Sequence, residues 1–162
     1  PILTYKLTPL MGRIEHTNLI IDDFSIARKD SERVYTHILT HIHTGIAFNT
    51  DHIKGLSDSW NFGPIYCSKI TAQLILQKFL VLPALYLSLY LEYLRSVNPT
   101  KLKMSPSLEL TVTLFDANHC FGAVMVLIEG YAGTILYSGD IRFDREVFKN
   151  YKLLYPPEMG DD

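Results

Sequence analysis

The histidines of this chain are clustered rather than evenly spread. Of its six, four lie between positions 37 and 52. His41 and His43 form a His-x-His pair at the end of an expected strand, where alternate side chains point to the same side. Two imidazoles on one side can chelate a borderline-soft ion such as zinc. For His16 and His37 we expect ordinary surface or core positions, because His16 precedes the first strand and His37 lies inside the second.

Other side chains that bind metals follow strands elsewhere in the chain. Asp51 and His52 come after the His-x-His pair, and His119 and Asp140 each follow an expected strand. Ligands at several strand ends can gather on one rim, where they fix an ion while an open coordination position holds water. The recurrence of this placement favours a catalytic metal site over isolated, hydrogen-bonded histidines.

The elements that must position these residues are mostly strands. Alternating or β-branched apolar runs predict strands at 18–21, 34–40, 64–67, 108–114, 123–129 and 134–137. Gly130 and Gly133 bracket a hairpin turn between the last two. Ser68 is a good N-cap for a helix over 69–79. Residues 85–91 fit a strand or a helix, and the segment from Asn98-Pro99 to Ser105-Pro106 reads as a loop.

Composition sets further bounds. A chain of 162 residues is one domain on length, and 48% hydrophobic with 20% charged residues excludes intrinsic disorder. Cys67 and Cys120 are the two cysteines, too few for a disulfide framework, which fits a reducing compartment. The net charge of −2 offers no basic footprint for nucleic acid. The longest apolar run, 79–91, is too short for a membrane helix and contains Pro83, so we expect no membrane contact. Many strands with few helices predict an α+β layered domain.

Several motifs carry a family resemblance. Residues 41–57 resemble the H-x-H-x-D-H signature of the metallo-β-lactamase fold. The runs LFDANHC at 114–120 and TILYSGDIR at 134–142, with 14–24, 55–60 and 65–71, resemble the DNA cross-link repair nucleases of the metallo-β-lactamase/β-CASP superfamily. The resemblance extends from about residue 14 to 143 and blurs between 80 and 107. It implies the N-terminal half of an αββα sandwich: an extension at 1–10, then a partial metallo-β-lactamase domain at 11–162, with the β-CASP domain and the remainder absent.

The resemblance also implies roles for individual residues. Asp23 would be the acidic residue of the first motif, which orients the histidine loop, and Asp51 a second catalytic carboxylate. One or two zinc ions are implied, and two ions roughly 3.5–4 Å apart would activate water and clamp both oxygens of a phosphodiester displacement. The implied ligands are His41, His43 and His119 for the first ion, Asp51 and His52 for the second, and Asp140 as the bridge between them.

The implied function is that of the 5′ exonuclease branch of the family. Such an enzyme degrades DNA from 5′ ends, single-stranded or overhanging, in the 5′→3′ direction, and acts in interstrand cross-link repair and telomere maintenance. We therefore expect a nuclear protein at chromosomes and telomeres, with a telomere-protein partner bound through a C-terminal region beyond Asp162. The hairpin-opening endonucleases of the same family are the nearest alternative.

Two departures from the family pattern keep other functions open. Residues 45–50 interrupt the second motif between Thr44 and Asp51, and Phe121 stands where the family has proline. We expect residues 45–50 to bulge out and to weaken metal binding, because a loose tether does not preorganise the ligands that follow it. The interruption favours a catalytically inactive relative that serves as a binding module. A metallo-β-lactamase-fold hydrolase of thioesters or lactones is the third possibility, disfavoured by residues 66–68 and 117–120.

Overall fold

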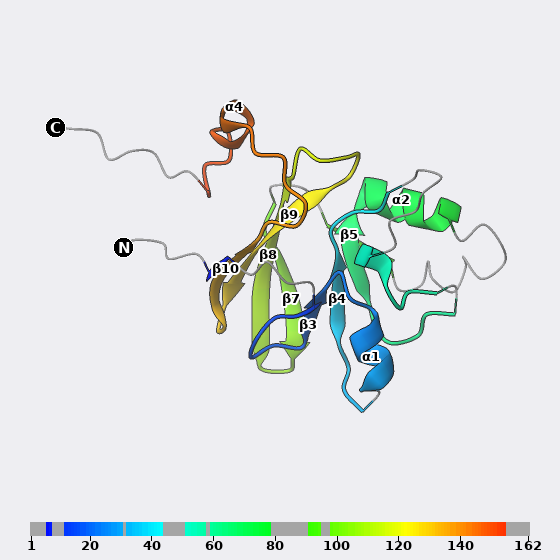
Figure 1. The fold of residues 1–162 in the computed structure, drawn as a ribbon. Helices are drawn as coiled ribbons and strands as arrows, with labels where there is room; N and C mark the ends of the chain where they lie inside the picture. The colour runs from blue at the N-terminus through cyan, green and yellow to red at the C-terminus, as the bar shows by residue number, and fades with distance from the viewer. Residues whose placement is uncertain are drawn as a thin grey trace.

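The fold is built on two β-sheets packed face to face. A computed structural model describes residues 6–7, 12–30, 32–43, 51–57, 59–78, 91–94 and 98–154. The helices α1 (Ser25–Lys29) and α2 (Lys69–Lys78) lie on the outer side of one sheet (Figure 1). Mixed α and β structure with two sheets and few helices confirms the layered architecture expected from the sequence. None of the helices within the described residues has the length and apolarity needed to cross a membrane.

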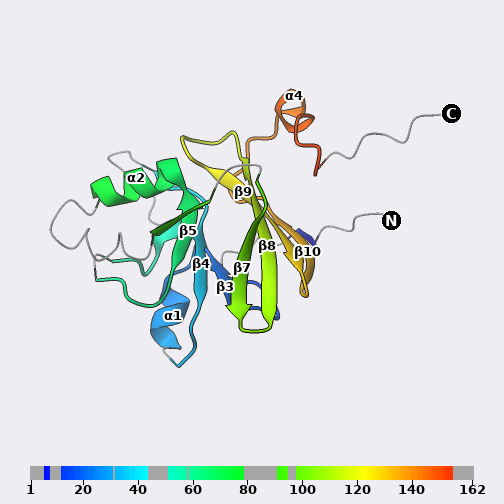
Figure 2. The ribbon, with the colours of Figure 1, turned by 180° about the vertical axis from the view of Figure 1, so that it is seen from behind.

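The first sheet is mainly antiparallel and has the strand order β1-β10-β9-β8-β7. Its strands are β1 (Lys6–Leu7), β7 (Thr100–Ser105), β8 (Leu108–Asp116), β9 (Val124–Gly130) and β10 (Gly133–Tyr137). The β9–β10 hairpin turns at the Gly130–Gly133 pair, as expected, and both glycines have positive φ. At the edge of this sheet, β1 pairs in parallel with β10. Figure 2 shows the β7–β8 hairpin from behind.

The second sheet positions most of the histidines. Its order is β2-β3-β4-β5-β6, and β3 to β6 run parallel. Its strands are β2 (Gly12–Arg13), β3 (Leu19–Ile21), β4 (Thr36–Leu39), β5 (Ile65–Ser68) and β6 (Leu91–Leu94). Because the carboxyl ends of parallel strands share one edge of a sheet, residues that follow β3 and β4 meet there.

Three apolar clusters define the layers. The first fills the space between the sheets, where Ile21 and Ile38 of one sheet meet Leu114 and Val126 of the other. The second joins the parallel sheet to α1 and α2 around Phe24 and Trp60. The third lies on the other face of the antiparallel sheet, beneath α4 (Arg145–Phe148). Its buried members are Phe115, Ala117, Ala123, Met125, Leu127 and Phe148.

All six expected strands and the expected helix are confirmed, with ends shifted by a few residues. The loop expected between Asn98 and Pro106 is wrong, because Thr100–Ser105 forms β7. Lys101 and Lys103 hide the strand signal, yet they point outward while Leu102 between them is buried, and the backbone pairs with β8. Of the ambiguous segment 85–91, residues before Leu91 lie outside the described residues.

Candidate metal centre

The centre lies where β4 ends and the two sheets are joined. The Val124 amide, at the start of β9, donates a hydrogen bond of 3.1 Å to the Thr40 carbonyl, just beyond β4. This bond links the parallel sheet to the antiparallel one. His41 follows directly after Thr40 and is 1% exposed. His43, two residues further along, is half-buried.

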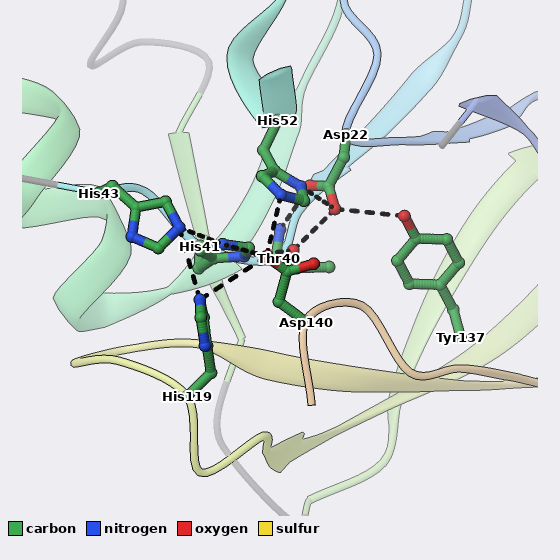
Figure 3. A network of polar contacts seen from close by, with 8 residues as sticks. All are labelled: Asp22, Thr40, His41, His43, His52, His119, Tyr137 and Asp140. Carbon is green, nitrogen blue, oxygen red and sulfur yellow. Dashed lines mark hydrogen bonds and ion pairs between the residues drawn. The ribbon is translucent and has the colours of Figure 1, made fainter. Parts of the chain in front are cut away.

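Three imidazoles converge at this point through their Nε2 atoms. The Nε2 atoms of His41 and His43 lie 3.2 Å apart, and those of His43 and His119 lie 3.4 Å apart. The rings stand nearly perpendicular to one another, with interplanar angles of 85° to 89° (Figure 3). Lone pairs aimed at a common point are the arrangement that imidazoles adopt around one ion. The structure therefore brings together the three residues expected for the first zinc.

Asp140 joins this group to His52. Its Oδ2 atom lies 3.6 Å from Nε2 of His41 and of His119, and 3.5 Å from Nε2 of His52. The Asp140 side chain is 44% exposed, so it stands at the mouth of the centre while His41 forms its floor. A carboxylate between two histidine groups has the placement of a bridging ligand.

The carboxylate that organises the histidine segment is Asp22, and the expectation that Asp23 does so is wrong. Asp22 is 1% exposed and accepts hydrogen bonds from the amide and hydroxyl of Thr40, at 2.9 and 2.7 Å. Its Oδ2 also lies 3.2 Å from Nδ1 of His52 and 3.4 Å from the Tyr137 hydroxyl. Asp22 has a φ of 56°, a left-handed backbone conformation that Asp tolerates better than most residues. The neighbouring Asp23 instead accepts from the Ser25 amide and hydroxyl, at the start of α1.

The electrostatics of the cluster keep His41 and His119 neutral, with a free lone pair, at neutral pH. Burial, reinforced by the charge of His52, lowers the pKa of His41 to about 4. Burial also lowers the pKa of His119, although Asp140 opposes the shift. Burial acts in the same sense on His52, but the carboxylates of Asp22 and Asp140 outweigh it and raise the pKa of His52. Neutral imidazoles beside carboxylates suit a divalent cation, so this donor set fits zinc.

Hydrogen bonds hold the loop that carries His119. The Asn118 amide donates to Oδ1 of Asp116 at 2.7 Å, and the Asn118 side chain donates to the Arg142 carbonyl at 3.2 Å. The Gly122 carbonyl accepts from the hydroxyls of Ser68 and Thr71, at 2.8 and 3.0 Å. These bonds tie the loop to β8, to the Asp140 loop and to the start of α2. The loop therefore has its own anchors although Phe121 replaces the expected proline.

The remaining site expectations have different outcomes. Asp51 begins the 3₁₀ helix η1 (Asp51–Ile53), but its side chain lies outside what the structure describes. Residues 44–50, which include the interruption, also lie outside the described residues. His16 is exposed and His37 is buried among aromatic rings, as expected. Sequence reasoning missed Cys120, whose Sγ groups with ring nitrogens of the three converging histidines within 4.8 Å.

Comparison with known proteins shows which family the chain belongs to. Mouse 5′ exonuclease Apollo is 38% identical to the chain over 146 residues, which are 87% of this chain and 24% of the relative. Chicken 5′ exonuclease Apollo is 39% identical over 132 residues, 80% of this chain and 24% of that protein. The DNA cross-link repair protein SNM1 of Arabidopsis thaliana is 30% identical over 149 residues, 91% of this chain and 27% of that protein. The chain belongs to the Apollo/SNM1 nuclease family.

The Apollo/SNM1 relationship covers the segments that build the centre, although the chain spans about a quarter of the length of these relatives. No protein-family model matches the chain. The family resemblance seen in the motifs is thus confirmed by matches to named relatives over most of this chain.

Proposed function

We propose that this chain forms part of a metal-dependent DNA nuclease of the Apollo type, a 5′→3′ exonuclease of interstrand cross-link repair. One observation carries the proposal: in a chain of the Apollo/SNM1 family, four imidazoles and a carboxylate converge at the joined edge of two sheets. By analogy with these relatives, the product would act in the nucleus, at DNA 5′ ends and telomeres.

The fold proposal rests on the order of the layers. Helices cover one outer face, two sheets follow, and α4 lies on the other outer face. This order is that of an αββα sandwich, and we assign the chain to the N-terminal half of a metallo-β-lactamase fold. The five donors then occupy the sheet edge where such a fold would carry its metal site.

The residues divide the work of the centre. His41, His43 and His119 would hold one zinc ion, while His52 and Asp140 would begin a second site. Zinc bound there would supply Lewis acidity toward phosphate oxygens and water. Asp22 supports the ligands without binding the ion itself. It accepts a hydrogen bond from the Thr40 amide next to His41 and orients His52 through Nδ1. A histidine that donates through one nitrogen to a carboxylate presents the other to a metal in a fixed direction.

Side chains suited to single-stranded DNA adjoin the donors in sequence. Phe121 is 85% exposed, and Phe143, whose ring lies 5.2 Å from that of Phe148, is 66% exposed; each lies within three residues of a donor. Arg142 is exposed as well, and its charge reaches His119 and Cys120. Exposed aromatic rings stack on bases and a guanidinium binds phosphate, so this local pairing offsets the absence of a basic overall charge.

The proposal is tested by metal content and by the direction of DNA digestion. Zinc per chain is measured after dialysis, and a 3′-labelled, 5′-phosphorylated single strand is followed for stepwise shortening. In a chain extended to the full fold, we expect bound zinc and shortening from the 5′ end. Asp140→Asn should lose digestion and the zinc held with His52, while the ion of the three converging histidines stays bound. Glu129→Gln, a carboxylate change away from the centre, should keep both zinc and digestion. DNA binding without zinc or digestion would support the binding module instead. Zinc with thioester or lactone hydrolysis alone would support the other hydrolase.

A second comparison addresses the interruption of the metal-binding motif. We propose that residues 45–50 loosen the placement of Asp51 and His52 and so weaken the second site. In a chain extended to the full fold, a variant that lacks residues 45–50 should bind more zinc, toward two ions per chain, and digest DNA faster. Equal zinc content and equal rates with and without the segment would show that it is a harmless loop.

A further inference from the structure

We propose that Cys120 is a fourth ligand of this centre, so that the first ion is held by three histidines and one thiolate. The inference rests on the proposed metal centre and goes beyond the ligand set implied by the family resemblance. It concerns Cys120, His41, His43 and His119 and assigns the soft donor of the site to the residue directly after His119.

Proximity of ligand atoms is the first argument. Sγ of Cys120 and one ring nitrogen from each of the three histidines all lie within 4.8 Å of one another. Asp140 does not belong to this group; it forms a second group with His41 and His52. The donors therefore form a set of four around His43 and a set of three around Asp140, with His41 common to both and His119 also 3.6 Å from Asp140.

The backbone around Cys120 is the second argument, because it restricts where the thiol can go. The Ala123 amide donates to the Cys120 carbonyl at 3.0 Å and closes a tight turn. Two residues further along, the Gly122 carbonyl accepts hydrogen bonds from the Ser68 and Thr71 hydroxyls. A β-carbon at Gly122 would meet the Thr71 amide and the Ile70 side chain at 2.9 Å, so the loop sits directly against α2. The backbone that carries the thiol is thereby held in place, and Cys120 is half-buried and free of any disulfide.

The chemistry of the donor set gives the proposal a consequence. When the thiol binds, the Sγ–metal bond forms and the thiol proton passes to solvent. Four protein donors complete the tetrahedral coordination that zinc adopts in closed sites, which leaves no position for water. The first ion would then be held firmly, and the open coordination needed for hydrolysis would fall to the group of His52 and Asp140.

Cobalt substitution tests the inference directly, because Cys67 and Cys120 are the two cysteines of the chain. We expect Co²⁺ to give visible d–d bands and an intense near-ultraviolet band from thiolate-to-cobalt charge transfer. The charge-transfer band should disappear in Cys120→Ser, while the d–d bands remain. It should persist in Cys67→Ala, since Cys67 is buried in the core beneath α2. Zinc affinity should fall at least roughly 10- to 100-fold in Cys120→Ser, because the loss of a group that only supports a ligand already has that effect.

A measurement on the unaltered chain guards against misfolded variants. Iodoacetamide should alkylate Cys120 in the metal-free chain and not in the zinc-loaded chain, read by mass spectrometry of the Cys120 peptide. Cobalt d–d bands without a charge-transfer band, or alkylation of Cys120 that zinc leaves unchanged, would overturn the inference and keep the histidine centre. Absence of every cobalt band would overturn the inference together with the proposed metal centre.

Discussion

Two histidines near one strand show how the same side chain serves two purposes. His37 lies within β4 and is 0% exposed, stacked on Phe24 with ring centroids 5.4 Å apart and edge-on to Trp60 at 4.8 Å. His41 lies two residues after β4 ends and is 1% exposed, but its ring contacts other imidazoles. Burial lowers the pKa of both to about 4.

The difference between the two histidines lies in their partners and not in their burial. Neither ring nitrogen of His37 has a hydrogen-bond partner among the described residues, so His37 behaves as an aromatic core residue. His41 has Thr40, His43 and Asp140 around its ring nitrogens. A perturbed pKa is therefore a poor guide to function here, and convergence of donors is a good one.

The largest expected effect on stability is at Asp22, which holds the backbone next to His41, the metal-centre histidine of the pair. Asp22→Asn should lower the free energy of unfolding by about 3–5 kcal/mol, because the change removes a buried charge that faces several donors. Asparagine tolerates the positive φ at this position, so backbone strain does not add to the effect. Urea unfolding measures the change. The matched control Asp23→Asn should cost under about 1 kcal/mol, because asparagine keeps an oxygen that can accept from Ser25; equal losses would refute the assignment of Asp22.

The next effect separates the two histidines by metal binding. At zinc concentrations near 100 times the dissociation constant, a bound ion adds about 2.7 kcal/mol of stability. His37→Phe should keep this gain, because its ring already packs as an aromatic. His41→Phe should abolish it, because the ring nitrogen that faces His43 is gone. Thermal unfolding with and without zinc reads both results, and a zinc-induced shift that survives in His41→Phe would remove His41 from the ligand set.

A smaller effect concerns pH and belongs to His37. Its pKa is lowered from 6.5 to about 4 on folding, so the unfolded chain takes up a proton that the folded chain refuses. The contribution of His37 to the free energy of unfolding is complete above the pKa of the unfolded chain, and it is lost as pH falls from about 6.5 toward 4. Between pH 7.5 and 5 the loss is about 2 kcal/mol. His37→Phe should unfold with a correspondingly weaker acid dependence in parallel urea titrations, and identical pH profiles would argue against a buried neutral imidazole.

The smallest effect concerns the loop that brings His119 to His41. Thr71→Val removes one of the two hydroxyls on the Gly122 carbonyl and should cost about 1 kcal/mol. Zinc affinity should fall slightly as well, because the loop gains freedom. Thr111→Val on β8, away from the loop, is the control and should leave zinc affinity unchanged. Calorimetric titration compares the two, and equal affinities would show that Ser68 alone suffices as the anchor.

Local patterns predicted the elements and several donors, while details set by packing escaped them. Strict alternation in β8 and the cap at Ser68 were sufficient signals for a strand and a helix. In β7, the lysines on either side of Leu102 obscured the same alternation. Asp22 and Asp23 are identical neighbours, and the choice of the one that faces the centre depends on the partners that the fold supplies, Thr40 and His52 for Asp22. Cys120 carried a signal in its position next to His119, but spacing alone did not reveal where its sulfur lies.

The order of the donors along the chain has a consequence for biosynthesis. His43 and His119 are 76 residues apart in sequence, and Asp140 follows later still. A ribosome therefore releases His41 and His43 long before their partners exist. Contacts between residues so distant form late, after the costly closure of a long loop. The emerging chain cannot complete this cluster, and metal loading must wait until the antiparallel sheet has been made and has packed against the parallel one.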